Sequence, residues 1–347
     1  MKIIIAGAYT IGTYLAQFLS RNKYNIILID EQEERLNKIG QDYDLLTLQG
    51  KPTSIQILQE ADVKHADLFI AVDPKETTNI TACTMAHHLG AKKTVAKIDN
   101  PEYLEPKNQE LFKLLGVDSL IYPELLAAKD IINGLKMSWV RQRWDVRGGA
   151  LVMLGIKLRD TCAILDKPLR EISGPNDPYH IVAIKRRNET IIPGGNETLQ
   201  REDLAYFMTT KEYIPYVRKL TGKEHYVDVK NVMIMGGGRT AVRSVKIMPE
   251  YMDIKIIENS FDRCEYLNEM FDESVLVING DGRDTDLLIE EGIRHTQAFV
   301  ALTPNAETNI LACMAAKSLG VRKTIAAVEN FDYVDMAANL DIGTIIN

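Results

Sequence analysis

The sequence predicts an α/β protein in which two Rossmann-like, doubly wound parallel-sheet domains are separated by a small α+β module. The first observation behind this prediction is a duplication, because the segment Thr77–Gly90 recurs at one constant offset as Glu307–Gly320. An offset of this length indicates a repeated domain rather than a solenoid. The second observation is that short apolar strands alternate with helices in both copies, which is typical of a parallel sheet with helices on both faces.

The elements of the first domain follow from its apolar periodicity. Lys2–Ala6 is a short apolar run of the kind that lies inside parallel sheets. Four more strands are predicted at Asn25–Ile29, Asp44–Leu48, Leu68–Val72 and Thr94–Ile98. Helices are predicted at Thr13–Arg21, Glu31–Ile39, Ser54–Ala61, Thr78–Leu89, Leu111–Leu115 and Glu124–Leu135. The last two carry apolar residues that nothing in the first domain covers, so we expect them to pack against another copy of the domain.

Residues 150–220 follow a different pattern, in which short β segments alternate with Gly- and Pro-rich turns. Strands are predicted at Ala150–Leu158, His180–Arg186, Thr190–Ile192 and Leu204–Thr209, with a closing helix at Glu212–Thr221. The predicted domains are therefore residues 1–134, 135–222 and 231–347. Because a β module follows only the first Rossmann-like domain, we expect the chain to be cut short at its C-terminal end.

The Gly-rich turn of the second copy matches the dinucleotide fingerprint G-x-G-x-x-G/A. It reads Gly236-Gly237-Gly238-Arg239-Thr240-Ala241. The turn follows a strand and opens a helix, whose N-terminal N–H groups and dipole favour a pyrophosphate. Glu258 ends the next strand at the spacing of the acid that binds ribose hydroxyls. The pattern predicts binding of NAD or an adenosine nucleotide rather than NADP.

The first copy keeps only part of this fingerprint. It reads Gly7-Ala8-Tyr9-Thr10-Ile11-Gly12. Asp30 supplies the acid, but Tyr9 stands where a glycine normally lets the backbone approach the pyrophosphate. A side chain there crowds the ligand unless its ring turns away or stacks on something. Two outcomes stay open: a weakened or altered nucleotide site, or a purely structural copy.

Catalytic and metal-binding constellations are not evident in the sequence. A dehydrogenase requires a proton donor or acceptor beside the nicotinamide, and the histidines offer none; His65 and His295 are repeat equivalents that we expect at helix ends. Asp281, Asp284 and Asp286 suggest a helix-capping loop more than a metal site. An NAD-dependent oxidoreductase with a β-rich substrate module and a nucleotide-free oligomerisation scaffold remain as alternatives.

Composition and charge exclude several classes of protein. The chain is 46% hydrophobic and 26% charged, so each domain can bury its own core. The net charge of −7 and the lack of a Lys/Arg run argue against nucleic acid. No apolar run approaches a membrane span or a signal peptide. Cys83 and Cys313 lie in apolar helices without metal-ligand spacing. We therefore expect a soluble, cytoplasmic chain.

These features resemble the RCK (or KTN) domain family, the nucleotide-sensing cytoplasmic domains of potassium channels and transporters. The resemblance rests on the Gly-rich openings, the Gly280-Asp281-Gly282 turn and the repeated T-N-I-x-A-C helices. The middle module, with Ile181–Arg186 and Ile191-Ile192-Pro193, resembles the companion C-terminal RCK subdomain. Two copies in one chain resemble the peripheral regulatory subunits of Trk-type potassium-uptake systems.

The resemblance implies regulatory binding of NAD(H) or ATP/ADP in the Rossmann clefts. It also implies self-association into a dimer or tetramer ring on the inner face of the cell membrane, under a membrane-embedded potassium transporter subunit of the Trk type. When the family's ligand contacts are matched to this sequence position by position, the resemblance adds Val72, Asp73 and Lys97 to the expected contacts of the first half.

In the second half, the resemblance adds Leu302 and Thr303, whereas Ala327 replaces Lys97. It also matches Glu124 to a position that in related potassium regulators approaches the nucleotide from a neighbouring subunit.

Overall fold

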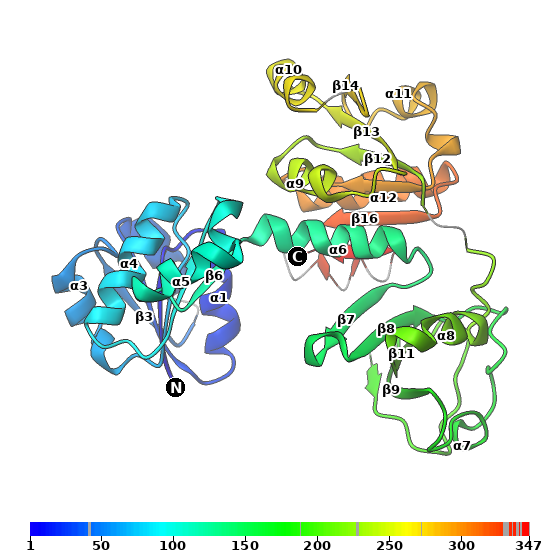
Figure 1. Cartoon of the computed structure of the whole chain (residues 1–347), viewed down its shortest axis with the longest axis horizontal. Coiled ribbons are helices and arrows are strands. Elements are labelled where there is room, and N and C mark those ends of the chain that lie inside the picture. The colour runs from blue at the N-terminus through cyan, green and yellow to red at the C-terminus, as the bar shows by residue number, and fades with distance from the viewer. Residues whose placement is uncertain are drawn as a thin grey trace. The chain divides into compact units, whose positions relative to one another are not determined.

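The computed structural model describes the chain except for residues 41–42, 188, 227–228, 272, 329–332, 335, 338–339, 341 and 347. The chain divides into two compact units, Met1–Pro123 and Glu124–Asn347. Figure 1 colours the chain from blue at the N-terminus to red at the C-terminus.

The first unit is built on a six-stranded parallel sheet in the order β3-β2-β1-β4-β5-β6. Its strands are β1 (Lys2–Ala6), β2 (Asn25–Asp30), β3 (Leu46–Gln49), β4 (Leu68–Ala71), β5 (Thr94–Lys97) and β6 (Ser119–Ile121). Its helices are α1 (Thr10–Ser20), α2 (Glu33–Gly40), α3 (Ile55–Glu60), α4 (Glu76–His88) and α5 (Pro106–Leu114). The strand order reverses between β1 and β4, which is where ligands bind in sheets of this kind.

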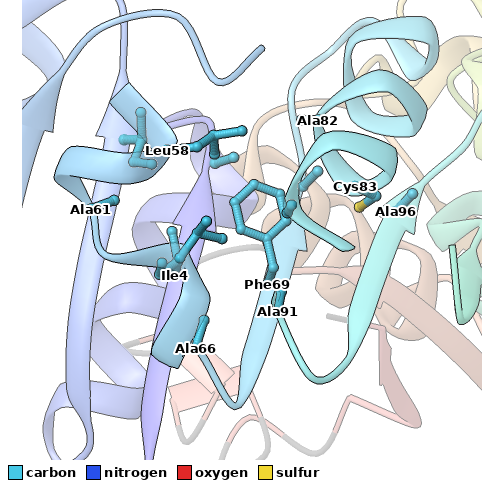
Figure 2. Packing of buried hydrophobic residues seen from close by; sticks show 14 of the residues in the cluster. Ile4, Leu58, Ala61, Ala66, Phe69, Ala82, Cys83, Ala91 and Ala96 are labelled. Atoms are coloured by element: carbon cyan, nitrogen blue, oxygen red, sulfur yellow. The ribbon is translucent and has the colours of Figure 1, made fainter. Parts of the chain in front are cut away.

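Both faces of the sheet are buried at its inner strands, which explains why β1, β2 and β4 are mainly apolar. On one face, Ile4 packs with Phe69 of β4 and Leu58 of α3, as Figure 2 shows. On the other face, Ile5 packs with Ala16 of α1 in a separate cluster. Neighbouring residues of β1 therefore enter different cores, because side chains alternate along a strand.

The second unit contains a parallel sheet with the same topology, in the order β14-β13-β12-β15-β16-β17. Its strands are β12 (Asn231–Met235), β13 (Asp253–Glu258), β14 (Val275–Asn279), β15 (Ala298–Ala301), β16 (Lys323–Ala327) and β17 (Thr344–Ile346). Its helices are α9 (Arg239–Ile247), α10 (Phe261–Met270), α11 (Thr285–Glu290) and α12 (Ala306–Ser318). The two matching sheets confirm the predicted fold class and its duplication.

The middle module contains a five-stranded antiparallel sheet in the order β10-β9-β11-β8-β7. Its strands are β7 (Gln142–Val146), β8 (Leu151–Lys157), β9 (Tyr179–Arg186), β10 (Glu189–Ile191) and β11 (Leu204–Thr209), and its helices are α7 (Leu169–Ile172) and α8 (Ile214–Leu220). The sequence did not predict β7. This strand lies at the sheet edge and is largely polar, so it lacks the apolar signal of an inner strand.

The repeated T-N-I motif has a structural explanation in both copies. Asn79 accepts a hydrogen bond from the backbone N–H of Asp73 at 2.7 Å and donates to the carbonyl oxygen of Lys97 at 2.9 Å. Asn309 makes the matching bonds to Thr303 and Ala327. Each asparagine is buried and ties together the ends of two neighbouring strands.

Helix α6 (Pro123–Lys136) buries its apolar face against the second parallel sheet. Its Ile131 and Leu135 are fully buried with Ile234 of β12 and Ile325 of β16, and Figure 1 shows α6 running alongside β16. The predicted burial of this helix against another copy of the domain occurs within the chain, so this helix needs no second chain to cover its apolar face. By contrast, Leu114 at the end of α5 is 83% exposed.

Among the described residues, no helix combines the length and the apolar character needed to cross a bilayer. His65 and His295 end two short 3₁₀ helices, Val63–His65 and Ile293–His295, as expected from the sequence.

Candidate functional site

A cavity of about 620 Å³ lies at the carboxyl ends of β12, β13 and β15 in the second parallel-sheet domain. This is the switch point of that sheet, and the volume falls in the range of small-molecule sites. The cavity is lined by residues of the Gly-rich loop and of the loops after β13, β14 and β15, among them Gly236, Gly237, Gly238, Glu258, Ser260, Arg263, Asp281, Arg283, Leu302 and Thr303.

Two glycines of this loop serve different purposes. Gly236 has φ +96°, a left-handed conformation that favours glycine. Gly238 has φ −67°, which any residue can adopt, and no described atom lies within 4 Å of the position that a Cβ would take there. The fold itself does not require glycine at 238. What glycine provides is open space in front of the α9 N-terminus, where anions bind.

Glu258 holds the Gly-rich loop against the end of β13. One carboxylate oxygen accepts the backbone N–H of Gly237 at 2.7 Å, and the other accepts that of Ser260 at 2.8 Å. The carboxylate is only partly buried and lines the cavity. Each oxygen has a further lone pair, so Glu258 can still accept hydrogen bonds from ribose hydroxyls.

Two arginines that the sequence reasoning did not select also line the cavity. Arg263 donates from Nε to the carbonyl oxygen of Gly237 at 2.8 Å and lies over the ring of Tyr266. Arg283 pairs with Asp281 at 2.7 Å, and this hydrogen bond holds the pKa of Asp281 below its usual range. The repeat contains a signal for Arg263, because Arg35 stands at the matching position, five residues after the acid.

Asp284 caps α11 by accepting hydrogen bonds from the backbone N–H groups of Asp286 and Leu287. This agrees with the helix-capping interpretation of the acidic loop. Within the described ranges, no group of His, Cys, Asp and Glu is arranged to hold a metal ion.

Arg239 and Thr240 form the first turn of α9, beside the lining of the cavity rather than within it. The Arg239 guanidinium lies 3.9 Å from the Glu124 carboxylate at the start of α6. The other Glu124 oxygen is buried and has no hydrogen-bond partner among the described residues. The resemblance suggests that this glutamate approaches from a neighbouring subunit. In this structure it reaches the α9 N-terminus of its own chain.

The first domain also brings most of its predicted site residues together at the carboxyl ends of its strands. Gly7, with φ +105°, lies so close to the loop after β4 that a Cβ there would approach the Asp73 nitrogen to 2.9 Å. Gly12 packs against Val72, and Asp30 accepts the backbone N–H of Ala8 at 2.7 Å. Thr10 and Ile11 open α1.

Tyr9 and Arg35 contact each other at the carboxyl ends of these strands. The guanidinium carbon of Arg35 is 3.7 Å from the centroid of the Tyr9 ring, and its Nη1 is 3.3 Å from Asp30. Lys97 is nearly buried and already pairs with Asp99 at 3.2 Å.

Two protein families match the chain. The TrkA-N domain matches residues 3–123 and 232–347, and the TrkA-C domain matches residues 153–222. The chain is 30% identical to the Trk system potassium uptake protein TrkA of Halomonas elongata, covering 100% of this chain and 76% of that protein. It is also 30% identical to the protein of that name from Vibrio alginolyticus, covering 97% of this chain and 74% of the relative. The chain thus spans about three quarters of the length of these relatives.

Solved structures share the fold at low identity. The GsuK RCK domain superposes with a TM-score of 0.71 at 16% identity, covering 99% of this chain and 73% of that chain. The GsuK channel bound to NAD gives a TM-score of 0.72 at 16% identity, covering 99% of this chain and 61% of that chain. The two parallel-sheet domains and the middle module thus have the architecture of RCK domains.

Proposed function

The chain belongs to the TrkA family, and on that premise we propose that it is a nucleotide-sensing regulatory subunit that gates a potassium-uptake transporter. The TrkA relatives and the GsuK RCK domain carry the names of potassium-uptake proteins and of a channel domain rather than of enzymes. A regulatory role needs a ligand site and a means of passing its state to a partner, without catalytic groups.

The ligand in this proposal is NAD(H) or ATP/ADP, bound in the cavity of the second parallel-sheet domain. The observation that carries the proposal is the open space at Gly238, where the local fold does not need glycine. A pyrophosphate fits this position because the first N–H groups of α9 point at it. Glu258 then accepts the ribose hydroxyls, and a carboxylate there repels the 2′-phosphate of NADP. GsuK structures bound to NAD and to ADP are consistent with either ligand.

Gating in this proposal is a population shift. A ligand that bridges the loops after β12, β13 and β14 favours the arrangement of those loops that it contacts best. Helix α6 packs on the same sheet through Ile131 and Leu135, and its first turn meets Arg239 beside the ligand site. A change in the loops therefore has a packed element through which it can reach the middle module.

The partner in this proposal is a membrane-embedded potassium transporter subunit of the Trk type. The chain lies in the cytoplasm, on the inner face of the membrane, as a dimer or tetramer ring. The exposed Leu111 and Leu114 of α5 support self-association, because apolar side chains in neighbouring turns favour burial against a partner. Sedimentation velocity at micromolar concentration checks this, and a monomer contradicts it.

The nucleotide is identified by thermal-shift measurements with NAD, NADH, ATP, ADP and AMP, combined with a dehydrogenase assay. A ligand present at a hundred times its Kd stabilises the folded state by about 2.7 kcal/mol, which a melting curve resolves. Stabilisation without turnover supports the regulator. Turnover supports an oxidoreductase, and no response to any nucleotide supports a scaffold that only oligomerises.

A further inference from the structure

We infer that the first parallel-sheet domain is closed to nucleotides by its own side chains, so that each chain binds a single nucleotide, in its second half. The closing group consists of Tyr9, Arg35 and Asp30. This inference rests on the proposed nucleotide binding of the second half, and it assigns that binding to one of the two copies.

The acid of the first copy is not accessible to a ribose. Asp30 is 3% exposed. One of its oxygens accepts the Ala8 N–H at 2.7 Å. The other accepts the Gln32 N–H at 2.8 Å and lies 3.3 Å from Arg35. The matching Glu258 makes the same two backbone bonds, but it is only partly buried and borders the cavity.

The position that a pyrophosphate needs is also filled. Tyr9 is the residue before α1, as Gly238 is the residue before α9, and their backbones agree closely, with φ −81° and ψ −177° against φ −67° and ψ −177°. The two loops therefore have the same shape. They differ in that one carries a ring where the other leaves open space.

The two matching arginines explain how the ring is held. Arg35 places its guanidinium 3.7 Å from the Tyr9 ring centroid while it pairs with Asp30, so one side chain joins the loop to the acid. Arg263 has no ring at 238 to stack on, and it turns to the carbonyl oxygen of Gly237 and to Tyr266. A cation held between a ring and a carboxylate takes the place that ribose and phosphate would need.

The test is calorimetric titration of the full chain with ADP and with NAD. The wild-type chain is expected to bind one nucleotide, and Gly238→Val to bind none. The double variant Tyr9→Gly with Arg35→Ala removes the closing side chains and keeps Asp30, so two sites are expected. Adding Gly238→Val to this double variant is expected to leave one site, which then lies in the first domain.

Tyr9→Phe is the matched control, because it keeps the ring under the guanidinium and should retain one site. Should the double variant fail to fold in a melting experiment, Tyr9→Gly alone gives the first loop the residue found at Gly238 and keeps the matching arginine, as in the second domain, so it should reveal the second site. Two sites in the wild type, or binding that survives Gly238→Val, overturns the inference. No binding by the wild type overturns the proposed function instead. In that case the variant that combines Tyr9→Gly, Arg35→Ala and Gly238→Val still tests the inference. If this variant has no nucleotide site, the inference is contradicted.

Discussion

The side-chain nitrogen of Lys323 lies 3.1 Å from the carbonyl oxygen of Val140 and donates a hydrogen bond to it. It also donates to the hydroxyl of Thr344 at 2.9 Å, and Thr344 in turn donates to the carbonyl oxygen of Arg141. Lys323 therefore ties β16 and β17 to the segment that leads from α6 into the middle module. Burial, and to a lesser degree the nearby Arg141, lowers the pKa of Lys323 to about 7.

The stability of the chain should depend on pH through Lys323. Its pKa is about 7 in the folded state and 10.5 ordinarily, so between these values the unfolded state holds one more proton. The free energy of unfolding then rises with pH across this window. The cost of burying the charged Lys323 side chain is fully present below pH 7. From pH 6 to 10 the wild type should therefore gain stability relative to Lys323→Met, and melting curves of the two proteins measure this change.

Lys93 provides the control for this experiment, because it occupies the matching position of the first domain and is exposed. Lys93→Met should follow the wild type at every pH. Burial lowers the pKa of Lys223 to about 8. This residue is present in all three proteins, so its contribution to the pH dependence is the same in each and drops out of the comparison. A stability difference between wild type and Lys323→Met that stays constant with pH contradicts the lowered pKa of Lys323.

Nucleotide binding should be lost in Gly238→Val without loss of fold. Nothing among the described residues contacts a side chain at 238, so the melting temperature without ligand should stay close to that of the wild type. The valine instead fills the space of the pyrophosphate. Gly194→Val is the matched control, since that glycine of the middle module also has open space around it. Full affinity in Gly238→Val would place the ligand elsewhere.

Glu124→Gln should strengthen nucleotide binding. The Glu124 carboxylate lies beside the α9 N-terminus, where it repels a phosphate and competes for Arg239, and one of its oxygens is buried without a hydrogen-bond partner among the described residues. Neutralising it should lower the Kd for ADP by roughly twofold to fivefold, the range of partly exposed ion pairs. Glu110→Gln on the exposed side of α5 should change nothing. Weaker binding in Glu124→Gln would show that the carboxylate assists the ligand.

The repeated cysteines should be unreactive in the folded protein. Cys83 and Cys313 are fully buried, and burial raises the pKa of each thiol to about 12. The thiolate is the reactive form, so iodoacetamide at pH 8 should leave both unmodified, as measured by mass spectrometry. All four cysteines should react after denaturation in guanidinium chloride. Prompt labelling of Cys83 in the folded chain would point to a role beyond packing.

Inner strands could be predicted closely because burial on both faces makes them continuous apolar runs. The predicted bounds of Lys2–Ala6 and Leu204–Thr209 agree with the structure. Edge strands are partly solvated and show no such continuous run, so β3 and β10 could be located only to within one or two residues and β7 not at all. Strand β7, with Arg143 and Asp145 in it, is the clearest example.

The nucleotide loops could be located because their signal is local. A strand, a tight turn and a helix N-terminus lie within a few residues, and Glu258 follows at a distance set by one helix and one strand. The packing of α6 carries no such signal. Its apolar face predicts burial, but only the folded chain shows that Ile131 and Leu135 are covered by the second sheet of the same molecule.

The sequence by itself determined the duplication, the alternation of strands and helices in the parallel-sheet domains, and the position of both Gly-rich loops, since each depends on periodicity and spacing along the chain. The tertiary structure decided how the two copies differ. Arg35 and Arg263 occupy the same place in the repeat, yet one stacks on Tyr9 and pairs with Asp30 while the other binds the Gly237 carbonyl. The physical reason is that a long, flexible cation takes whichever partners lie within its reach, and those partners come from segments that only folding brings together.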